Sequence, residues 1–235
     1  MVYIHSDTDR KLPHNFDAAC ALYGALEQGE DIRLTSFEEV TSGKFDLLLG
    51  KKLFVGSVDF TTEVFKRAGK SVASLNNPYR QTTITSIKDA RKEVESGQPL
   101  FIKPLQTKLF TGMVFTKADL SQISKYPADT EVIISKPFTA PILSEWRCYV
   151  QNQKIVDSRN YAGDFRVVPD FALADQQVAV LDEYPVAYTF DVCILENGEQ
   201  VVIELNDMWA IGNYGIENPI YYQLLFDRYI EIMST

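Results

Sequence analysis

The chain has 235 residues, of which 46% are hydrophobic, and its formal net charge at pH 7 is −9. A chain of this length can bury about 70% of its unfolded surface, so one large domain or two closely packed lobes both fit. The negative charge leaves no broad basic surface for phosphate backbones, which argues against sequence-independent binding of nucleic acid.

Cysteine usage and hydropathy indicate a cytoplasmic protein. The cysteines Cys20, Cys148 and Cys193 lie far apart without the spacing of a zinc site, which favours free thiols in a reducing compartment. No stretch approaches the ~20 apolar residues of a membrane span, so we expect no membrane association.

The first part of the chain predicts a small α/β domain. Strands are expected at 2–5 and 32–35, and helices at 15–26 and 58–68, where apolar residues recur with helical spacing. Strands that alternate with helices are typical of an α/β unit. Paired asparagines and a proline at 76–78 break the pattern, so we place the boundary near residue 80.

A second series of elements follows this boundary. The pattern predicts a charged helix, two apolar strands, a hairpin around Asn152, a further helix and a carboxy-terminal helix, at 85–96, 100–104, 131–135, 146–159, 175–183 and 219–233 respectively.

The segment from Tyr188 to Asn206 predicts a β-hairpin that brings two acids together. Two runs of strand formers flank Asn197-Gly198, the preferred dipeptide of a two-residue type I′ turn. That turn pairs Glu196 with Glu199 and, counted back, places Asp191 opposite Glu204 and Thr189 opposite Asn206. Because side chains alternate along a strand, Asp191, Glu204 and Asn206 then project from one face.

This acidic face is a candidate metal site. Like charges directly opposite each other destabilise a sheet, so we expect a cation between Asp191 and Glu204. Two carboxylates and the amide of Asn206 suit Mg²⁺, which usually completes its ligands with water and nucleotide phosphates. The alternative is a solvated acidic edge with lysines nearby.

Three cationic side chains are candidates for phosphate contacts. Lys103 ends an apolar strand beside a polar loop that contains Lys108, where its ammonium could meet a phosphate or remain an ordinary surface charge. Arg147 lies inside an aromatic strand, as a snorkelling edge residue or as a fork for carboxylate or phosphate. A two-residue turn after Asn152 would set Arg147 opposite Ser158, and a three-residue connection would set it opposite Arg159.

Other catalytic signals are weak. His5 and His14 are the only histidines, and their place near the amino terminus favours a structural or surface role. The sequence has no Walker loop, no G-x-G-x-x-G, no nucleophile elbow and no plausible cysteine-histidine pair, which disfavours covalent catalysis by the protein.

Several motifs together resemble a known family. Ser144-Glu-Trp-Arg-Cys-Tyr-Val-Gln-Asn152, Arg159, Phe190-Asp191-Val192 and Ile203-Glu204-Leu205-Asn206 are similar to the divergent ATP-grasp clade named for two arginines and a lysine. This clade includes the eukaryotic cell-division-cycle protein that assembles a translation initiation factor. The resemblance extends over about residues 100–232.

The resemblance implies an α/β (α+β) ATP-grasp fold, in which two lobes hold ATP between them behind a small pre-ATP-grasp domain. The implied domains are 1–80 for the amino-terminal domain and 81–235 for the ATP-grasp domain, with lobes at 81–138 and 139–235.

The resemblance also implies roles for individual residues. Lys103 would contact the α- and β-phosphates, and the loop with Lys108 would cover them. Arg147 and Arg159 would approach the γ-phosphate or an acyl phosphate. The remaining implied contacts are the backbone of Ile134, Ser135 and Lys136 at the adenine edge, and Asp191, Glu204 and Asn206 on Mg²⁺.

Two functions are compatible with these roles. Glu204 stands where the eukaryotic protein usually has aspartate, and Asp207 where it has proline, which favours catalysis as in ligases of the wider superfamily. We therefore expect an ATP- and Mg²⁺-dependent carboxylate-amine ligase that acts through an acyl phosphate on small or peptide substrates. The alternative is an ATP-binding assembly factor for a protein partner. A third reading, RNA end repair, suits the charge of −9 poorly.

Overall fold

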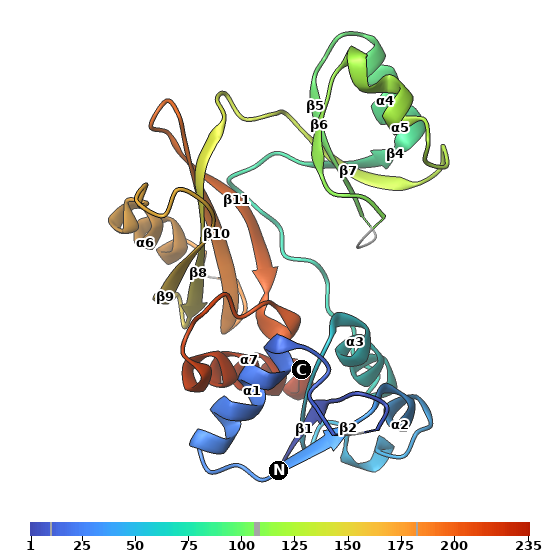
Figure 1. The fold of residues 1–235 in the computed structure, drawn as a ribbon, viewed down its shortest axis with the longest axis vertical. Helices are drawn as coiled ribbons and strands as arrows, with labels where there is room; N and C mark the ends of the chain where they lie inside the picture. The colour runs from blue at the N-terminus through green and yellow to red at the C-terminus, as the bar shows by residue number, and fades with distance from the viewer. Residues whose placement is uncertain (10, 106–108, 182) are drawn as a thin grey trace. The chain divides into compact units, whose positions relative to one another are not determined.

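The described residues form two compact units in the computed structural model, which describes residues 1–9, 11–105, 109–181 and 183–235 (Figure 1). Unit 1 comprises Met1–Asn76, Ile142–Ile194 and Gly198–Thr235, and unit 2 comprises Asn77–Pro141 with Leu195–Asn197. Both units combine helices with sheets, which confirms the predicted α/β class. The predicted domain boundaries at residues 80 and 138 stay a prediction. Among the described residues, no helix has the length and apolar character needed to cross a bilayer.

The amino-terminal part of unit 1 is a parallel sheet flanked by helices. Strands β1 (Val2–His5), β2 (Ile32–Thr35) and β3 (Leu53–Val55) pair in the order β2-β1-β3. Helices α1 (Phe16–Glu27), α2 (Phe37–Thr41) and α3 (Val58–Arg67) begin at the caps Asn15, Ser36 and Ser57, whose side chains accept backbone N–H groups. A 3₁₀ turn, η1 (Asp46–Leu48), precedes β3.

Helix α1 packs closely against the last helix, α7 (Asn218–Ser234), and both contribute to the core of unit 1. Gly24 makes this approach possible, because a Cβ at this position would overlap the backbone oxygen of Asn218. The expected carboxy-terminal helix over 219–233 is confirmed.

His5 ends β1 inside this core and is expected to make stability depend on pH. Its ring stacks between His14 and Phe60, and burial, aided by His14, lowers the pKa of His5 to about 4. The unfolded chain therefore binds a proton at higher pH than the folded one. The free energy of unfolding should fall by about 2–3 kcal/mol through this group as the pH drops from 7 to 4.

Chemical denaturation at several pH values measures this effect. The His5→Phe variant keeps the stacking but cannot titrate, so the wild-type protein should lose more stability than the variant between pH 7 and 4. Parallel curves for the two proteins would contradict the assignment.

The rest of unit 1 is built on an antiparallel sheet. Strands β8 (Ile142–Gln151), β9 (Lys154–Gly163), β10 (Ala187–Leu195) and β11 (Gln200–Asp207) pair in the order β11-β10-β8-β9. The helix expected at 175–183 is α6 (Phe171–Ala179), which starts earlier because Asp170 caps it. The 3₁₀ turn η3 (Met208–Ala210) follows β11.

The β10–β11 hairpin has the predicted pairing at Asp191 but a different turn. Asp191 lies opposite Glu204, and Thr189 opposite Asn206, as expected. Near the turn, however, Ile194 pairs with Gln200, one residue out of the predicted register. The prediction of a type I′ turn is wrong, since that turn needs positive φ at both central residues and Asn197 lacks it. A bulge between Asp191 and Val192 restores the register.

The type I′ geometry occurs instead in the β8–β9 hairpin. Asn152 and Gln153 have φ values of 50° and 61° between the two strands. This two-residue turn alone would set Arg147 opposite Ser158. A bulge after Tyr149 adds one residue, so Arg147 pairs with Arg159.

Unit 2 is a second antiparallel sheet with helices packed against it. Its strands pair in the order β4-β7-β5-β6, and they are β4 (Thr83–Ser86), β5 (Leu100–Pro104), β6 (Met113–Phe115) and β7 (Glu131–Ser135). The other elements are α4 (Ile87–Glu95), η2 (Lys117–Asp119) and α5 (Leu120–Ile123). Helix α4 begins at the cap Ser86 and packs through Ile87, Ala90 and Val94 into the core of this unit.

Candidate functional site

Four charged side chains lie in a row across one face of the sheet in unit 1. From β11 to β9 they are Glu204, Asp191, Arg147 and Arg159. Cross-strand pairing places Glu204 opposite Asp191 and Arg147 opposite Arg159. Hydrogen bonds join Arg147 to Asp191. The row therefore brings two carboxylates and two guanidinium groups onto a single surface, and Arg147 and Arg159 share a face.

The central pair is a buried, two-pronged ion pair. Arg147 Nε donates to Asp191 Oδ1 at 3.0 Å, and Nη2 donates to Oδ2 at 2.7 Å. Arg147 is 5% exposed and Asp191 is 0% exposed. Burial opposes the charge on Arg147, but its bonds to Asp191 outweigh this and raise the pKa of the guanidinium. The cation expected beside Asp191 is therefore, in the protein itself, an arginine from the neighbouring strand.

The electrostatics of Asp191 reflect its acidic neighbours. Burial is the largest influence and raises the pKa of Asp191 to about 6, with the Glu204 and Glu145 carboxylates acting in the same direction. The bonds from Arg147 oppose this rise. An additional cation at this surface would stabilise the charged form of Asp191.

Glu204 and Asn206 extend the row at its acidic end. Both are half-buried, and Asn206 Nδ2 donates to Glu204 Oε1 at 3.1 Å. Together with Asp191 they offer only oxygen ligands, which is the donor chemistry that Mg²⁺ prefers. No group of three or more His, Cys, Asp or Glu side chains arranged to hold a metal occurs among the described residues, so two carboxylates and one amide are the available set.

Two tyrosines that the sequence did not reveal cover Arg147. Tyr161 and Tyr214 stack with ring centroids 5.1 Å apart, and the Arg147 guanidinium lies 5.7 Å and 4.6 Å from their centroids. Tyr161 donates to Glu145 Oε2 at 2.9 Å. Tyr214 has a φ of 48°, an uncommon conformation for a tyrosine, held within a loop. Position alone could have suggested Tyr161, two residues after Arg159, whereas nothing in the sequence indicates Tyr214.

Arg159 has donors available at the basic end of the row. Its Nη2 donates to Asp157 Oδ2 at 2.7 Å, on the same strand. Its Nε is buried and has no hydrogen-bond partner in the described part of the chain. A buried donor without a partner suits a site where a ligand supplies the acceptor.

The remaining predicted residues lie in unit 2. Phe101, two residues before Lys103 on β5, pairs with Ser135 on β7, and Ile134 is buried in the core. Lys136 follows β7 and is exposed. Lys103 is half-buried next to Gly112, where a Cβ would come within 2.8 Å of the Lys103 Cβ. Lys108 lies outside the described residues.

Arg80 is a further residue of unit 2 that sequence reasoning missed. Its Nη2 donates to Ser135 Oγ at 2.8 Å. Its guanidinium lies 4.8 Å from the ring centroid of Phe101 and 4.6 Å from that of Phe138. These contacts fix Ser135, which was predicted to lie at the adenine edge, with a cation held between two aromatic rings.

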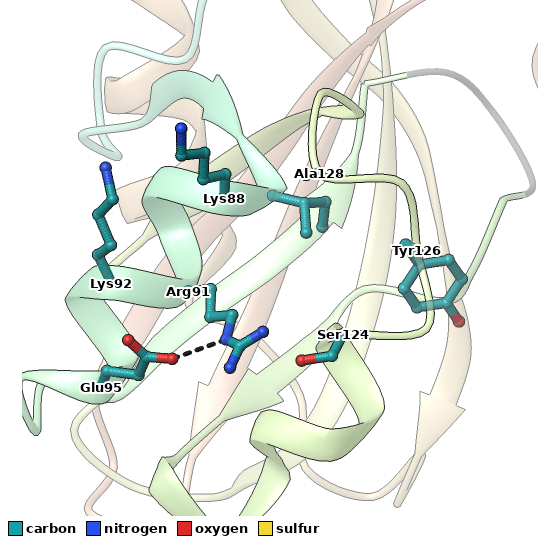
Figure 2. A pocket seen from close by; sticks show the side chains of 8 residues that line it. Lys88, Arg91, Lys92, Glu95, Ser124, Tyr126 and Ala128 are labelled. Atoms are coloured by element: carbon teal, nitrogen blue, oxygen red, sulfur yellow. Dashed lines mark hydrogen bonds and ion pairs between the residues drawn. The ribbon is translucent and has the colours of Figure 1, made fainter.

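Unit 2 also contains a pocket of about 270 Å³ beside α4 (Figure 2). Lys88, Arg91 and Lys92 line it together with Tyr126. Arg91 is paired with Glu95 at 2.7 Å, as the dashed line shows. None of the predicted site residues in the described part of the chain lines this pocket.

The fold is that of ATP-grasp enzymes. The RimK domain ATP-grasp protein of Sphaerobacter thermophilus matches with a TM-score of 0.55 at 12% identity, over 99% of this chain and 98% of that one. D-alanine–D-alanine ligase of Bacillus anthracis, complexed with ATP, gives 0.52 at 13% identity, over 99% and 97%. The ATP-grasp ligase PsnB, complexed with a minimal precursor, gives 0.52 at 12% identity, over 96% and 98%. The predicted ATP-grasp fold is therefore confirmed.

Sequence comparison is more specific. The chain belongs to the family described as ATP-grasp domain, family 2 of the clade named for two arginines and a lysine, whose sequence profile matches residues 78–224. Membership of the ATP-grasp superfamily, whose members are ATP-dependent carboxylate-amine ligases, is thus confirmed. A search of curated proteins gives no match. The predicted relation to the eukaryotic initiation-factor assembly protein stays a prediction.

Proposed function

We propose that this protein is an ATP- and Mg²⁺-dependent ligase that joins a carboxylate to an amine. The observation that carries the proposal is the row of Glu204, Asp191, Arg147 and Arg159 across one sheet face. A row with acids at one end and guanidinium groups at the other can bind a cation and a transferring phosphoryl group side by side.

The proposed reaction has two steps. The substrate carboxylate attacks the γ-phosphorus of ATP, the bond to the β-phosphate oxygen breaks, and an acyl phosphate and ADP form. The amine then attacks the acyl carbon, phosphate leaves with the bonding electron pair, and the amine loses a proton as the amide forms. Neither step needs a nucleophile from the protein, in keeping with the lack of such motifs.

The chain's own side chains would provide binding and charge neutralisation. Arg147, fixed by Asp191 and the two tyrosines, would present its remaining N–H groups to the γ-phosphoryl oxygens, and Arg159 would bind the same group through its unpartnered Nε. Asp191, Glu204 and Asn206 would hold Mg²⁺, which supplies charge neutralisation for the phosphates when bound. In unit 2, Lys103 and Lys108 would contact phosphates and the backbone at 134–136 the adenine.

The metal assignment predicts that Glu204→Gln weakens ATP binding mainly when Mg²⁺ is present. The lost charge matters only while the cation is bound, so affinity in Mg²⁺ should fall by about 10-fold or more, the effect typical of residues that support a metal site. Affinity in EDTA should hardly change. Calorimetric titration of ATP in both buffers measures the difference.

Glu196→Gln is the matched control, because Glu196 is an exposed acid in the turn of the same hairpin. Equal, small losses for Glu204→Gln in both buffers would remove the metal assignment. Release of ADP in the presence of amino-acid or peptide mixtures tests the reaction itself. Tight ATP binding without any ADP release would favour the assembly-factor function.

A further inference from the structure

A cavity of about 460 Å³ opens at the carboxyl ends of the three parallel strands of unit 1. Its lining comes from the residues that end or follow each strand: His5 and Asp7 at β1, Phe37 and Glu38 at β2, and Asp59 at β3. Small-ligand pockets have volumes of about 300–1,000 Å³, and in parallel α/β sheets they lie at this edge. None of the residues predicted to bind ATP or Mg²⁺ lines this cavity.

The cavity is negatively charged. It is lined by the carboxylates of Asp7, Glu38 and Asp59, and no lysine or arginine in the described part of the chain lines it. Nor does any described lysine or arginine form an ion pair with these three acids. Glu38 and Asp59 lie in the first turns of α2 and α3, where an acid favours the helix. Helix stability accounts for neither Asp7 nor the histidine beside it.

His5 provides an independent sign of a ligand. Its side chain is 95% buried, given its 5% exposure, yet it lines the cavity. The Ser57 backbone N–H donates to His5 Nδ1 at 3.4 Å, which places the ring proton on Nε2. Within the described residues, Nε2–H has no hydrogen-bond partner. Buried donors are nearly always paired, so this one calls for an acceptor supplied from the cavity.

We infer that this cavity binds a small molecule that carries a positively charged amine or guanidinium group together with a hydrogen-bond acceptor. The cationic group would meet the three carboxylates and the exposed ring of Phe37, and the acceptor would meet His5 Nε2–H. The lowered pKa of His5, about 4, leaves its ring neutral at pH 7, so it adds no charge that would repel a cation.

A chain of contacts within unit 1 links the cavity to the charged row. His14, which lines the cavity, precedes the α1 cap Asn15, and Asp17 in the first turn accepts the backbone N–H of Asn213 at 2.9 Å. The next residue, Tyr214, lies against Arg147. If the protein is the ligase proposed above, on which this step rests, the cation is a feature of one of the two substrates.

Calorimetry with L-arginine, in the absence of ATP and Mg²⁺, tests the inference on the full chain. L-arginine has a guanidinium group and a carboxylate acceptor, and L-citrulline is its uncharged analogue of nearly the same shape. We expect saturable binding of L-arginine, and binding of L-citrulline weaker by about 10-fold or more, as expected for loss of a charged hydrogen bond.

Two variants assign the binding to this cavity. Glu38→Gln combined with Asp59→Asn should weaken L-arginine binding about 10-fold or more, whereas Asp89→Asn, which removes a first-turn acid from α4 outside the cavity, should leave it unchanged. His5→Phe keeps the ring stacking and removes the donor, so it should also weaken binding. Circular dichroism establishes that each variant is folded.

Absence of saturable L-arginine binding, equal binding of L-citrulline, or unchanged binding by the folded Glu38→Gln/Asp59→Asn variant would overturn the inference. Because the titration contains neither ATP nor Mg²⁺, such a failure leaves the ligase proposal standing. Conversely, a protein that binds L-arginine but never releases ADP would lose the ligase function and keep the cation site.

Discussion

Replacing Arg147 with lysine is expected to lower turnover about 100-fold or more while ATP affinity changes only a few-fold. Lysine keeps the positive charge, so the attraction to phosphate remains. It loses the planar fork that Asp191 and the two tyrosines hold in place, and with it the aligned donors for the transferring group. ADP release per folded molecule and a calorimetric ATP titration of the same variant measure the two quantities.

Arg166→Lys is the control for this experiment. Arg166 also pairs with a carboxylate, that of Asp164, but its side chain is 76% exposed, so its replacement should leave turnover unchanged. If Arg147→Lys lowers thermal stability and leaves turnover per folded molecule intact, then Arg147 only packs beside its aromatic neighbours and has no part in phosphoryl transfer.

The second large effect concerns the stability of the protein without ligands. Arg147→Met leaves the buried Asp191 carboxylate without its counter-ion, which should cost about 3–5 kcal/mol in the free energy of unfolding. Opposed acids alone would suggest that neutralising Asp191 stabilises the sheet. The ion pair reverses this expectation, because Asp191→Leu in turn leaves the buried guanidinium unpaired.

A double-mutant cycle separates these contributions. Arg147→Met combined with Asp191→Leu replaces the ion pair with apolar side chains, so it should recover most of the stability that each single change removes. Urea unfolding of the four proteins without Mg²⁺ provides the free energies. Additive losses in the double variant would mean that the two side chains stabilise the sheet independently.

The sequence predicted the position of the acidic pair more reliably than the path that leads to it. Asp191 faces Glu204 as expected, yet only because a longer connection at Asn197 and a bulge beside Asp191 offset each other by one residue. A bulge has no fixed sequence pattern, since it depends on how neighbouring strands twist and pack. The pairing of Arg147 with Arg159 depended on a bulge in the same way.

Contacts between distant parts of the chain were beyond reach of the sequence. Arg147 and Asp191 are 44 residues apart on strands that are not joined by a turn, so no local pattern pairs them. Tyr214 reaches Arg147 from a loop, and Arg80 reaches Ser135 from a segment before β4. The local signals were strong where periodicity sets the structure, as in β1, α1 and α7.

The packing of α1 against α7 has a consequence for how the protein folds during synthesis. The core of the amino-terminal sheet includes Tyr221, Leu225 and Tyr229 of α7, which the ribosome makes about 200 residues after β1. Unit 2, being almost continuous in sequence, can complete its core while the first strands still await their partner helix. Late closure of such distant contacts carries a loop-closure cost and slows folding, so nascent chains should expose the apolar face of α1 until α7 emerges.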